Sequence, residues 1–302
     1  LSNTGLINST SAGSNLSVAA GNVSNSGNIS SSANTTVIAA SVINNGTIGG
    51  YDTVVSASGN ISNINSGNIS GYNVNVTGGN ISGSGTVSGI NNITMNASAG
   101  DLTAGAITAG NITLGAGNTL SITGSVNATS GDVKLAGGLI SNSGSIEASN
   151  NIAASSAAMN SNASLKASNI SVTGNLTSQG TISAQNLSVS NNLSNSGNIS
   201  SYNVSVGNNL SNTGLINSTS AGSNLSVWAG NVSNSGTISS GNTTVTANSV
   251  DNSGTISSRY DTLVTTSGNM SNSGTISGSD VNVTGGNISG SGTVSGANNI
   301  TM

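Results

Sequence analysis

Residues 210–239 read LSNTGLINSTSAGSNLSVWAGNVSNSGTIS, and residues 1–30 repeat this stretch with only two differences, where Ala19 and Asn28 replace Trp228 and Thr237. The stretch contains a short phrase, Gly-x-Ile/Val/Leu or a close variant, that recurs along the whole chain about every 19 residues. Such a period is typical of a solenoid, in which each repeat buries its apolar face against its neighbours. The apolar anchors of the phrase are Ile7, Ile29, Ile48, Ile69, Val87, Ile107, Val126, Ile146, Leu165, Ile182, Ile199, Ile216, Ile238, Ile256, Ile276 and Val294.

Between the anchors, aliphatic residues alternate with Ser, Thr and Asn, as in Asn-Val-Ser-Val at 203–206. This period of two indicates β-strands, with examples at 231–233, 236–239 and 243–246. Asn-Ser-Gly corners separate the strands, and we expect Gly and Asn there because they accept left-handed backbone. The sequence therefore predicts an all-β fold, a right-handed parallel β-helix (β-solenoid) of about 16 coils of about 19 residues, with no separate globular domain. At about 4.8 Å per coil, the coils would form a rod about 75 Å long.

The composition supports a narrow core. The 302 residues include 33% apolar residues and 43 glycines, but no Phe, Pro, Cys or His. A chain this rich in Gly, Ser and Asn with 3% charged residues could instead be disordered. The regular recurrence of β-branched residues argues for a folded repeat array.

Charge and chemistry exclude several classes of function. The net charge is −4, and the basic residues are only Lys134, Lys166 and Arg259, so no basic stripe could bind nucleic acid. Without His or Cys, the common nucleophilic and transition-metal sites lack their residues, and we expect no enzyme activity, metal or other cofactor. No apolar stretch of about 20 residues could span a bilayer, and the first residues do not read as a signal peptide.

The chain also contains a longer repeat. Ile7 and Ile216 are equivalent positions of its two copies and lie eleven anchors apart, so eleven short repeats make one long repeat. We therefore expect a single continuous solenoid over 1–302, with one long repeat at 1–209 and a partial second copy at 210–302. The array starts and stops inside a copy, which indicates a piece of a much longer protein.

The alternation also predicts the interior. Stacked aliphatic columns would form the core, and the corner Asn side chains would form a ladder of amide hydrogen bonds between coils, each worth on the order of 1 kcal/mol. The predicted core residues are Val23, Ile29, Ile48, Ile199, Val232, Ile238, Ile256 and Ile276. The predicted ladder residues are Asn25, Asn142, Asn195, Asn234, Asn252 and Asn272.

Ligand-binding candidates are few. Trp228 should point outward, because Leu225 and Val227 occupy inward positions of the alternation. An exposed Trp can contact sugar or protein, or can simply pack over a neighbouring corner. The weak candidates for ligand binding are therefore Trp228, Tyr51 and Tyr260.

A catalytic corner at Arg259, Tyr260 and Asp261, with Asp251 nearby, is a further hypothesis. The first copy has Ile43 in place of Asp251, so the acid pair is not kept and an ordinary solvated corner is favoured.

Asn-x-Ser/Thr triplets recur, for instance at Asn22, Asn28, Asn80 and Asn231, and could in principle accept glycans. The alternation of outward Asn, inward aliphatic and outward Ser creates the same triplet without any glycan. The nonapeptide of calcium-binding β-rolls is absent.

Three phrases resemble the filamentous haemagglutinin repeat: Leu-x-Asn-x-Gly-x-Ile-x-Ser at 210–218, Asn-Leu-Ser-Val-x-Ala at 224–229, and Gly-Asn-Val-x-Asn-Ser-Gly-Thr-Ile at 230–238. The resemblance covers nearly the whole chain, except that the corner phrase is often replaced between 103 and 166. It implies a large exoprotein secreted by the two-partner route and folded as a right-handed parallel β-helix at the cell surface. Its motif specifies the shaft of such a protein.

The sequence thus favours the structural shaft of a large secreted or cell-surface adhesin, a stiff spacer that presents a distal binding or toxin domain. The alternative is a fibre-forming protein that assembles into extracellular filaments. The expected location is extracellular, on a bacterial cell surface. Expected partners are an outer-membrane secretion partner, a receptor or glycan on a host or neighbouring cell bound through regions outside this sequence, and further copies of the chain in a filament.

Overall fold

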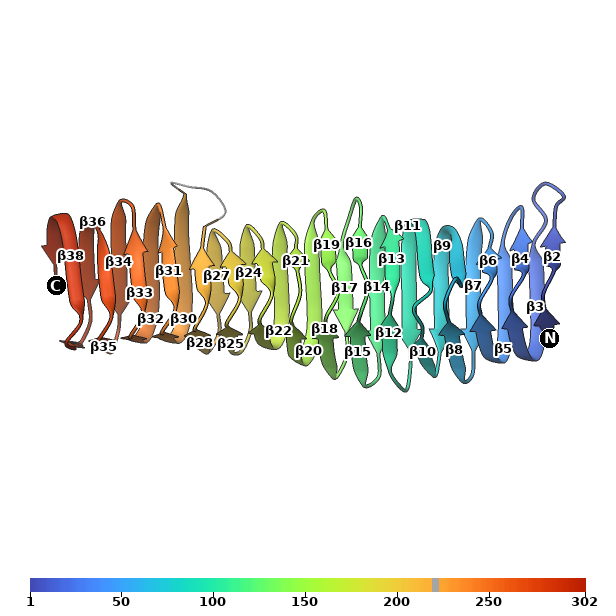
Figure 1. The fold of residues 1–302 in the computed structure, drawn as a ribbon, viewed down its shortest axis with the longest axis horizontal. Coiled ribbons are helices and arrows are strands. Elements are labelled where there is room, and N and C mark those ends of the chain that lie inside the picture. Colours follow the sequence, from blue (N-terminus) through green and yellow to red (C-terminus); the bar gives the residue numbers. More distant parts are fainter. Residues whose placement is uncertain (219–222) are drawn as a thin grey trace. The chain divides into compact units, whose positions relative to one another are not determined.

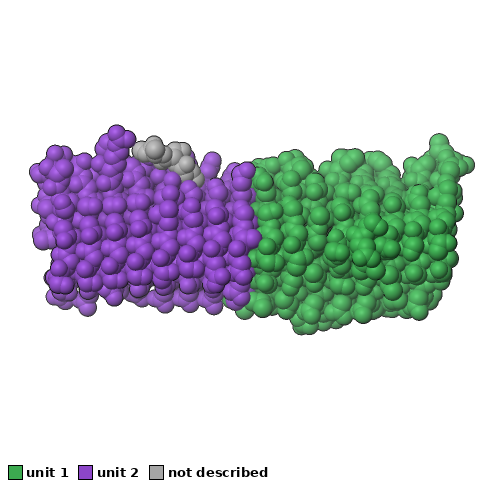
Figure 2. Space-filling view, viewed as in Figure 1, with its two compact units in different colours: residues 1–157 green, residues 158–302 purple. Residues whose placement is uncertain are grey.

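A computed structural model describes residues 1–218 and 223–302. The described residues form parallel β-strands and no helix. They divide into two compact units, unit 1 at Leu1–Ala157 and unit 2 at Ala158–Met302 (Figure 2). The predicted solenoid over 1–302 includes residues 219–222, which lie outside the described residues.

Unit 1 contains nineteen strands, and a twentieth, β20 (Asn151–Ser161), crosses its boundary. They are β1 (Ser2–Asn3), β2 (Leu6–Ser9), β3 (Leu16–Asn25), β4 (Asn28–Ser31), β5 (Thr35–Asn44), β6 (Thr47–Gly49), β7 (Asp52–Ala57), β8 (Asn60–Asn63), β9 (Asn68–Gly78), β10 (Asn80–Ser82), β11 (Thr86–Ala97), β12 (Leu102–Ala104), β13 (Ala106–Ala109), β14 (Asn111–Ala116), β15 (Thr119–Ile122), β16 (Val126–Ala128), β17 (Val133–Ala136), β18 (Leu139–Asn142) and β19 (Ile146–Ala148).

Unit 2 repeats the same kinds of strand. They are β21 (Leu165–Lys166), β22 (Asn169–Ser178), β23 (Thr181–Ser183), β24 (Asn186–Val189), β25 (Leu193–Asn195), β26 (Asn198–Ser200), β27 (Asn203–Val206), β28 (Asn209–Asn212), β29 (Leu215–Asn217), β30 (Asn224–Asn234), β31 (Thr237–Ser240), β32 (Asn242–Asn252), β33 (Thr255–Ser258), β34 (Asp261–Thr266), β35 (Asn269–Asn272), β36 (Thr275–Thr284), β37 (Asn287–Ser289) and β38 (Thr293–Thr301).

Each coil has three faces, which we call A, B and C. In one coil of unit 1, the first half of β5 (residues 35–39) forms face A, its second half (residues 42–44) forms face B, and β6 forms face C. Each segment pairs in parallel with its equivalent in the next coil, so strands of one face follow each other in chain order within each unit (Figure 1).

The sixteen anchors all lie on face C. In unit 1 they pair in register from Ile7 to Ile146, and in unit 2 from Leu165 to Val294. Register holds although the spacing varies, because extra residues are absorbed at the corners. This arrangement confirms the predicted parallel β-solenoid with a repeat near 19 residues; its right-handed sense stays a prediction.

The core contains one aliphatic column or more from each face. In a single coil, Val23 comes from face B, Ile29 from face C and Val37 from face A, and each is at most 1% exposed. The other residues expected in the core, each at most 2% exposed, are Ile48, Ile199, Val232, Ile238, Ile256 and Ile276.

Glycine ends the Asn-Ser-Gly phrases between faces B and C for a reason different from the expected one. A Cβ atom on Gly254 would lie 2.1 Å from the carbonyl oxygen of Gly236 in the preceding coil, so no side chain fits. At the corners between faces B and C, positive φ angles occur at Asn65, inside the Asn-Ser-Gly of 65–67, and at Gly83 and Gly290, but at none of the glycines that end the Asn-Ser-Gly phrases. Left-handed backbone therefore occurs at a few of these corners, whereas the glycine that ends the phrase is required because successive coils stack backbone on backbone.

Candidate functional site

A ladder of buried asparagine side chains runs along the corner between faces B and C. In unit 1 the amide of Asn3 donates to Asn25, Asn25 to Asn44 and Asn44 to Asn63, each at 2.8 Å. In unit 2 an equivalent ladder of 2.8 Å bonds connects five successive coils through Asn195, Asn212, Asn234, Asn252 and Asn272.

Each buried amide also bonds to backbone. The Nδ2 atom of Asn234, for example, donates to the carbonyl oxygens of Thr255 at 3.0 Å and Gly236 at 3.3 Å. The predicted residue Asn142 is buried, but its register partner in the preceding coil is Ile122. Sequence reasoning missed four ladder members, which share an Asn-x-Gly signal or its close variant: Asn3, Asn44, Asn63 and Asn212.

A second ladder lies on the surface, at the corner where face C leads into face A. In unit 1 the carboxylate or amide oxygen of one coil accepts a hydrogen bond from the backbone or side chain of the next coil, at 2.9 to 3.3 Å. The side chains in this outer ladder are Asn15, Asn34, Asp52, Asn73, Asn92, Asn111, Asp132 and Asn151.

The corner between faces A and B carries a third ladder, and it includes several Asn-x-Ser/Thr triplets. The amide of Asn231 donates to Asn209 at 2.9 Å and accepts from Ser249 at 2.7 Å. The amide of Asn80 donates to Asn60 at 3.0 Å. A glycan on either nitrogen would replace one of the two N–H hydrogens from which this ladder is built, which favours the interpretation that the triplets serve coil stacking.

All four tyrosines occupy one kind of position, at the corner between faces C and A. Each directly precedes a residue with an equivalent hydrogen bond between coils: Asp52, Asn73, Asn203 or Asp261. The rings of Tyr51 and Tyr72 in neighbouring coils stack with centroids 5.0 Å apart and planes within 3°. Tyr51 is 57% exposed. Ile90, which follows in the next coil at a break in strand register, is 74% exposed.

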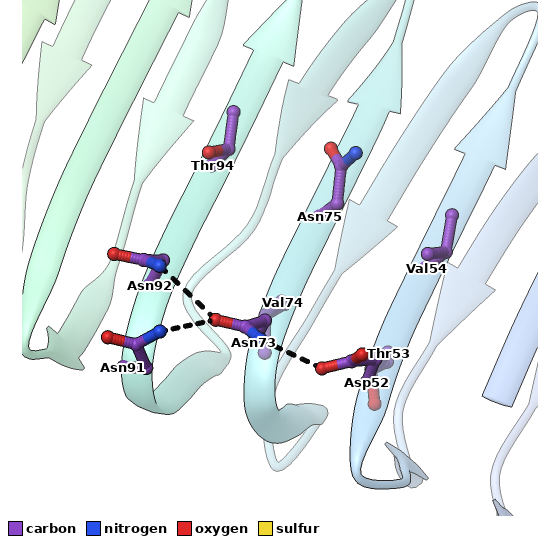
Figure 3. A pocket seen from close by; sticks show the side chains of 9 residues that line it. All are labelled: Asp52, Thr53, Val54, Asn73, Val74, Asn75, Asn91, Asn92 and Thr94. Carbon is purple, nitrogen blue, oxygen red and sulfur yellow. Dashed lines mark hydrogen bonds between the residues drawn. The ribbon is translucent and has the colours of Figure 1, made fainter. Parts of the chain in front are cut away.

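A shallow polar pocket of about 450 Å³ lies on face A beside this tyrosine pair. Figure 3 shows Asn73 at its centre: its amide donates to Asp52 at 2.9 Å, and its oxygen accepts from Asn91 at 3.1 Å and Asn92 at 3.3 Å. Asn75 projects from the same face. The pocket offers amides, hydroxyls and one carboxylate to a polar ligand, but the amides of Asn91 and Asn92 already donate to Asn73, which itself donates to Asp52.

The proposed catalytic corner is split by the fold. The guanidinium of Arg259 lies over the ring of Tyr260, 5.3 Å from its centroid. Asp261 begins face A and pairs in register with Asp280, whereas Asp251 lies on face B in register with Ser271. The two acids Asp251 and Asp261 therefore lie on different faces of the coil.

Trp228 is 44% exposed, while Leu225 and Val227 beside it are fully buried. A second shallow hollow, of about 560 Å³, surrounds Trp228 on face A of unit 2.

Within the described part of the chain, no helix has the length and apolar character needed to cross a membrane, and no three acidic residues gather as a metal site would require. Comparison with protein-family models, with curated proteins and with solved structures finds no match to this chain.

Proposed function

We propose that this chain is the structural shaft of a large secreted or cell-surface adhesin, a stiff spacer that presents a distal binding or toxin domain. The observation that carries the proposal is the use of polar side chains as ladders between coils: the buried ladder and the two surface ladders join successive coils in both units. Polar side chains that hydrogen-bond to the neighbouring coil stiffen the repeat array, and they do not assemble a reactive centre.

The energetics of a solenoid suit a spacer. Stability in such an array is approximately a sum of terms for each coil and each interface between neighbours, so the array can lengthen by duplication without a new core. The near identity of residues 1–30 and 210–239 fits growth by duplication. We assign no catalytic reaction to this chain, since it contains no His or Cys.

The resemblance to filamentous haemagglutinin repeats supports the remaining parts of the proposal. These parts are export through an outer-membrane secretion partner, a position on the bacterial cell surface, and contact with a receptor or glycan through regions outside this sequence.

A deletion of one long repeat tests the spacer role. Removing residues 20–228 joins Ala19 to Ala229, the equivalent of Ala20 in the second copy, so the junction stays in phase and eleven coils are taken out. We expect the cell-surface projection that carries this segment to shorten by about 53 Å in cryo-electron tomograms, since coils are spaced by about 4.8 Å. Binding by the distal domain should persist.

The matched control removes residues 20–235 and joins Ala19 to Gly236, out of phase with the coil. This deletion should disrupt folding at the junction. Filaments made of several chains with a regular subunit step, and with a length that the in-phase deletion does not change, would contradict the spacer role and favour the fibre-forming alternative.

A further inference from the structure

A groove on face A of unit 2 has Trp228 as its exposed platform. Trp228 lies on β30 and pairs in register with Ser205 of one neighbouring coil and Thr246 of the other. Its indole is 44% exposed, and the adjacent Val227 anchors the strand in the core. The ring is thus held on a rigid sheet rather than on a loop.

Glycines line the groove beside the indole. Gly207 and Gly230 line the hollow of about 560 Å³. A Cβ atom on Gly207 would lie 1.9 Å from the carbonyl oxygen of Ser190, so this part of the wall cannot carry a side chain. At these two positions the groove is therefore lined by backbone.

The remaining wall combines small apolar side chains with hydroxyls and one amide, and it is uncharged. Thr246 and Thr265 continue the row of Trp228 at successive coils, and Asn248 lines the edge. None of the described residues that line this groove carries a charge. From the row of Ser205 to that of Thr265 the groove spans three coil spacings, or about 14 Å, which is long enough for a short oligosaccharide.

These features select one class of ligand. A flat aromatic ring packs well against the apolar C–H face of a sugar ring, while hydroxyl and amide groups nearby can bond the sugar hydroxyls. A cationic ligand would find no carboxylate in the groove lining, and an anionic ligand would find no basic group. We propose that the Trp228 groove binds an uncharged glycan, which would give the shaft a binding site of its own, beyond its spacer role.

The first copy provides an internal comparison. The residue equivalent to Trp228 is Ala19, and its row continues with Ile38 and Ser56 instead of Thr246 and Thr265. The platform and its first hydroxyl are therefore absent from the otherwise near-identical stretch in unit 1. The first copy already has Ala at this position, so the variant Trp228→Ala should fold normally.

The test uses the 302-residue chain and an array of neutral oligosaccharides, with sialylated and sulfated oligosaccharides on the same array. We expect binding to a subset of the neutral ones. Because Trp228 is the single tryptophan of the chain, each hit can be titrated directly by its fluorescence, which should change saturably.

Trp228→Ala should weaken the affinity for the hit by about tenfold or more, measured by calorimetry because the fluorophore is lost. Trp228→Phe should retain part of the affinity, and Thr246→Val should lower it a few-fold. Tyr260→Ala, an aromatic truncation outside the groove, should leave it unchanged. Circular dichroism and hydrogen exchange should match the unaltered chain in each variant.

Three results would overturn the proposal: no binding to any neutral oligosaccharide, undiminished binding by Trp228→Ala, or self-association that sedimentation shows to depend on Trp228. The last result would identify the groove as a contact between copies of the chain. The spacer role does not depend on these outcomes, since the in-phase deletion tests length and not glycan affinity.

Discussion

At the scale of single residues, the buried asparagines show how a polar side chain can stabilise a narrow core. Asn234 is fully buried, donates to Asn252 and to two carbonyl oxygens, and accepts from Asn212. A buried amide is costly when unpaired, so its value depends on the unbroken ladder. The energy lost with one member should therefore exceed that of a single hydrogen bond.

Asn234→Ala should accordingly destabilise its region of unit 2 by about 3 kcal/mol, because it removes several bonds and leaves the Oδ1 atom of Asn252 unpaired. Hydrogen exchange of the amides in β28, β30 and β32 would measure this loss. The control is Asn231→Ala, which truncates an exposed member of a surface ladder and should cost less than about 1 kcal/mol. Equal losses in the two variants would contradict the special role of the buried ladder.

The start of the unit 2 ladder offers the opposite test. Ser178 is fully buried one coil before Asn195 and pairs with it in register, and both the hydroxyl oxygen of Ser178 and the Oδ1 atom of Asn195 lack a hydrogen-bond partner. Ser178→Asn should extend the ladder and stabilise these coils by about 1 kcal/mol. Denaturant unfolding would detect the gain. The control is Ser194→Asn, on the exposed side of β25 in the next coil, which should show no gain in stability.

At the scale of the coil, aliphatic columns and backbone stacking make each coil depend on its two neighbours. Ile238 on face C is fully buried and lies between Ile216 and Ile256 in register. Local damage should therefore spread to adjacent coils and then fade, as expected for a quasi-one-dimensional array.

Ile238→Asp places an unpaired charge in this column and should cost more than about 4 kcal/mol locally. Hydrogen exchange should lose protection in β29, β31 and β33 while unit 1 keeps it. Ser211→Asp, on the exposed side of β28, serves as the control and should leave protection unchanged. Simultaneous loss of protection in both units would contradict the nearest-neighbour description.

Gly254→Ala tests the close stacking of the corners. The new methyl group would lie 2.1 Å from the carbonyl oxygen of Gly236, so the coils must separate, and we expect a loss of about 3 kcal/mol in unfolding experiments. The control is Gly21→Ala, because a Cβ atom there meets nothing within 4 Å. That substitution should be neutral or slightly stabilising.

At the scale of the whole molecule, stability comes from neutral contacts. The 302 residues include three basic and seven acidic side chains, and the ladders consist mainly of uncharged amides. We expect the free energy of unfolding to change by less than about 1 kcal/mol from about 0.01 M to about 1 M NaCl, although the screening length falls about tenfold. Sodium sulfate should instead stabilise the chain through exclusion from its surface. A large loss in NaCl would assign stability to ion pairs.

The sequence by itself determined the period, the strands, the inward aliphatic residues and the outward direction of Trp228, because a fixed repeat and an alternation of two are local properties of the chain. It also indicated part of the buried ladder, since the Asn-Ser-Gly phrase marks that corner.

Only the tertiary structure decided which side chains become neighbours across coils. The outer ladder of Asp52 and Asn73, the stacked Tyr51 and Tyr72, and the groove beside Trp228 each join residues about 20 positions apart in the chain. The repeats vary in length from 17 to 22 residues, and the corners accommodate the difference. The register that brings such residues together is therefore set by coil stacking and not by sequence spacing. The same stacking explains why the glycines that end the Asn-Ser-Gly phrases serve close contact instead of a left-handed turn.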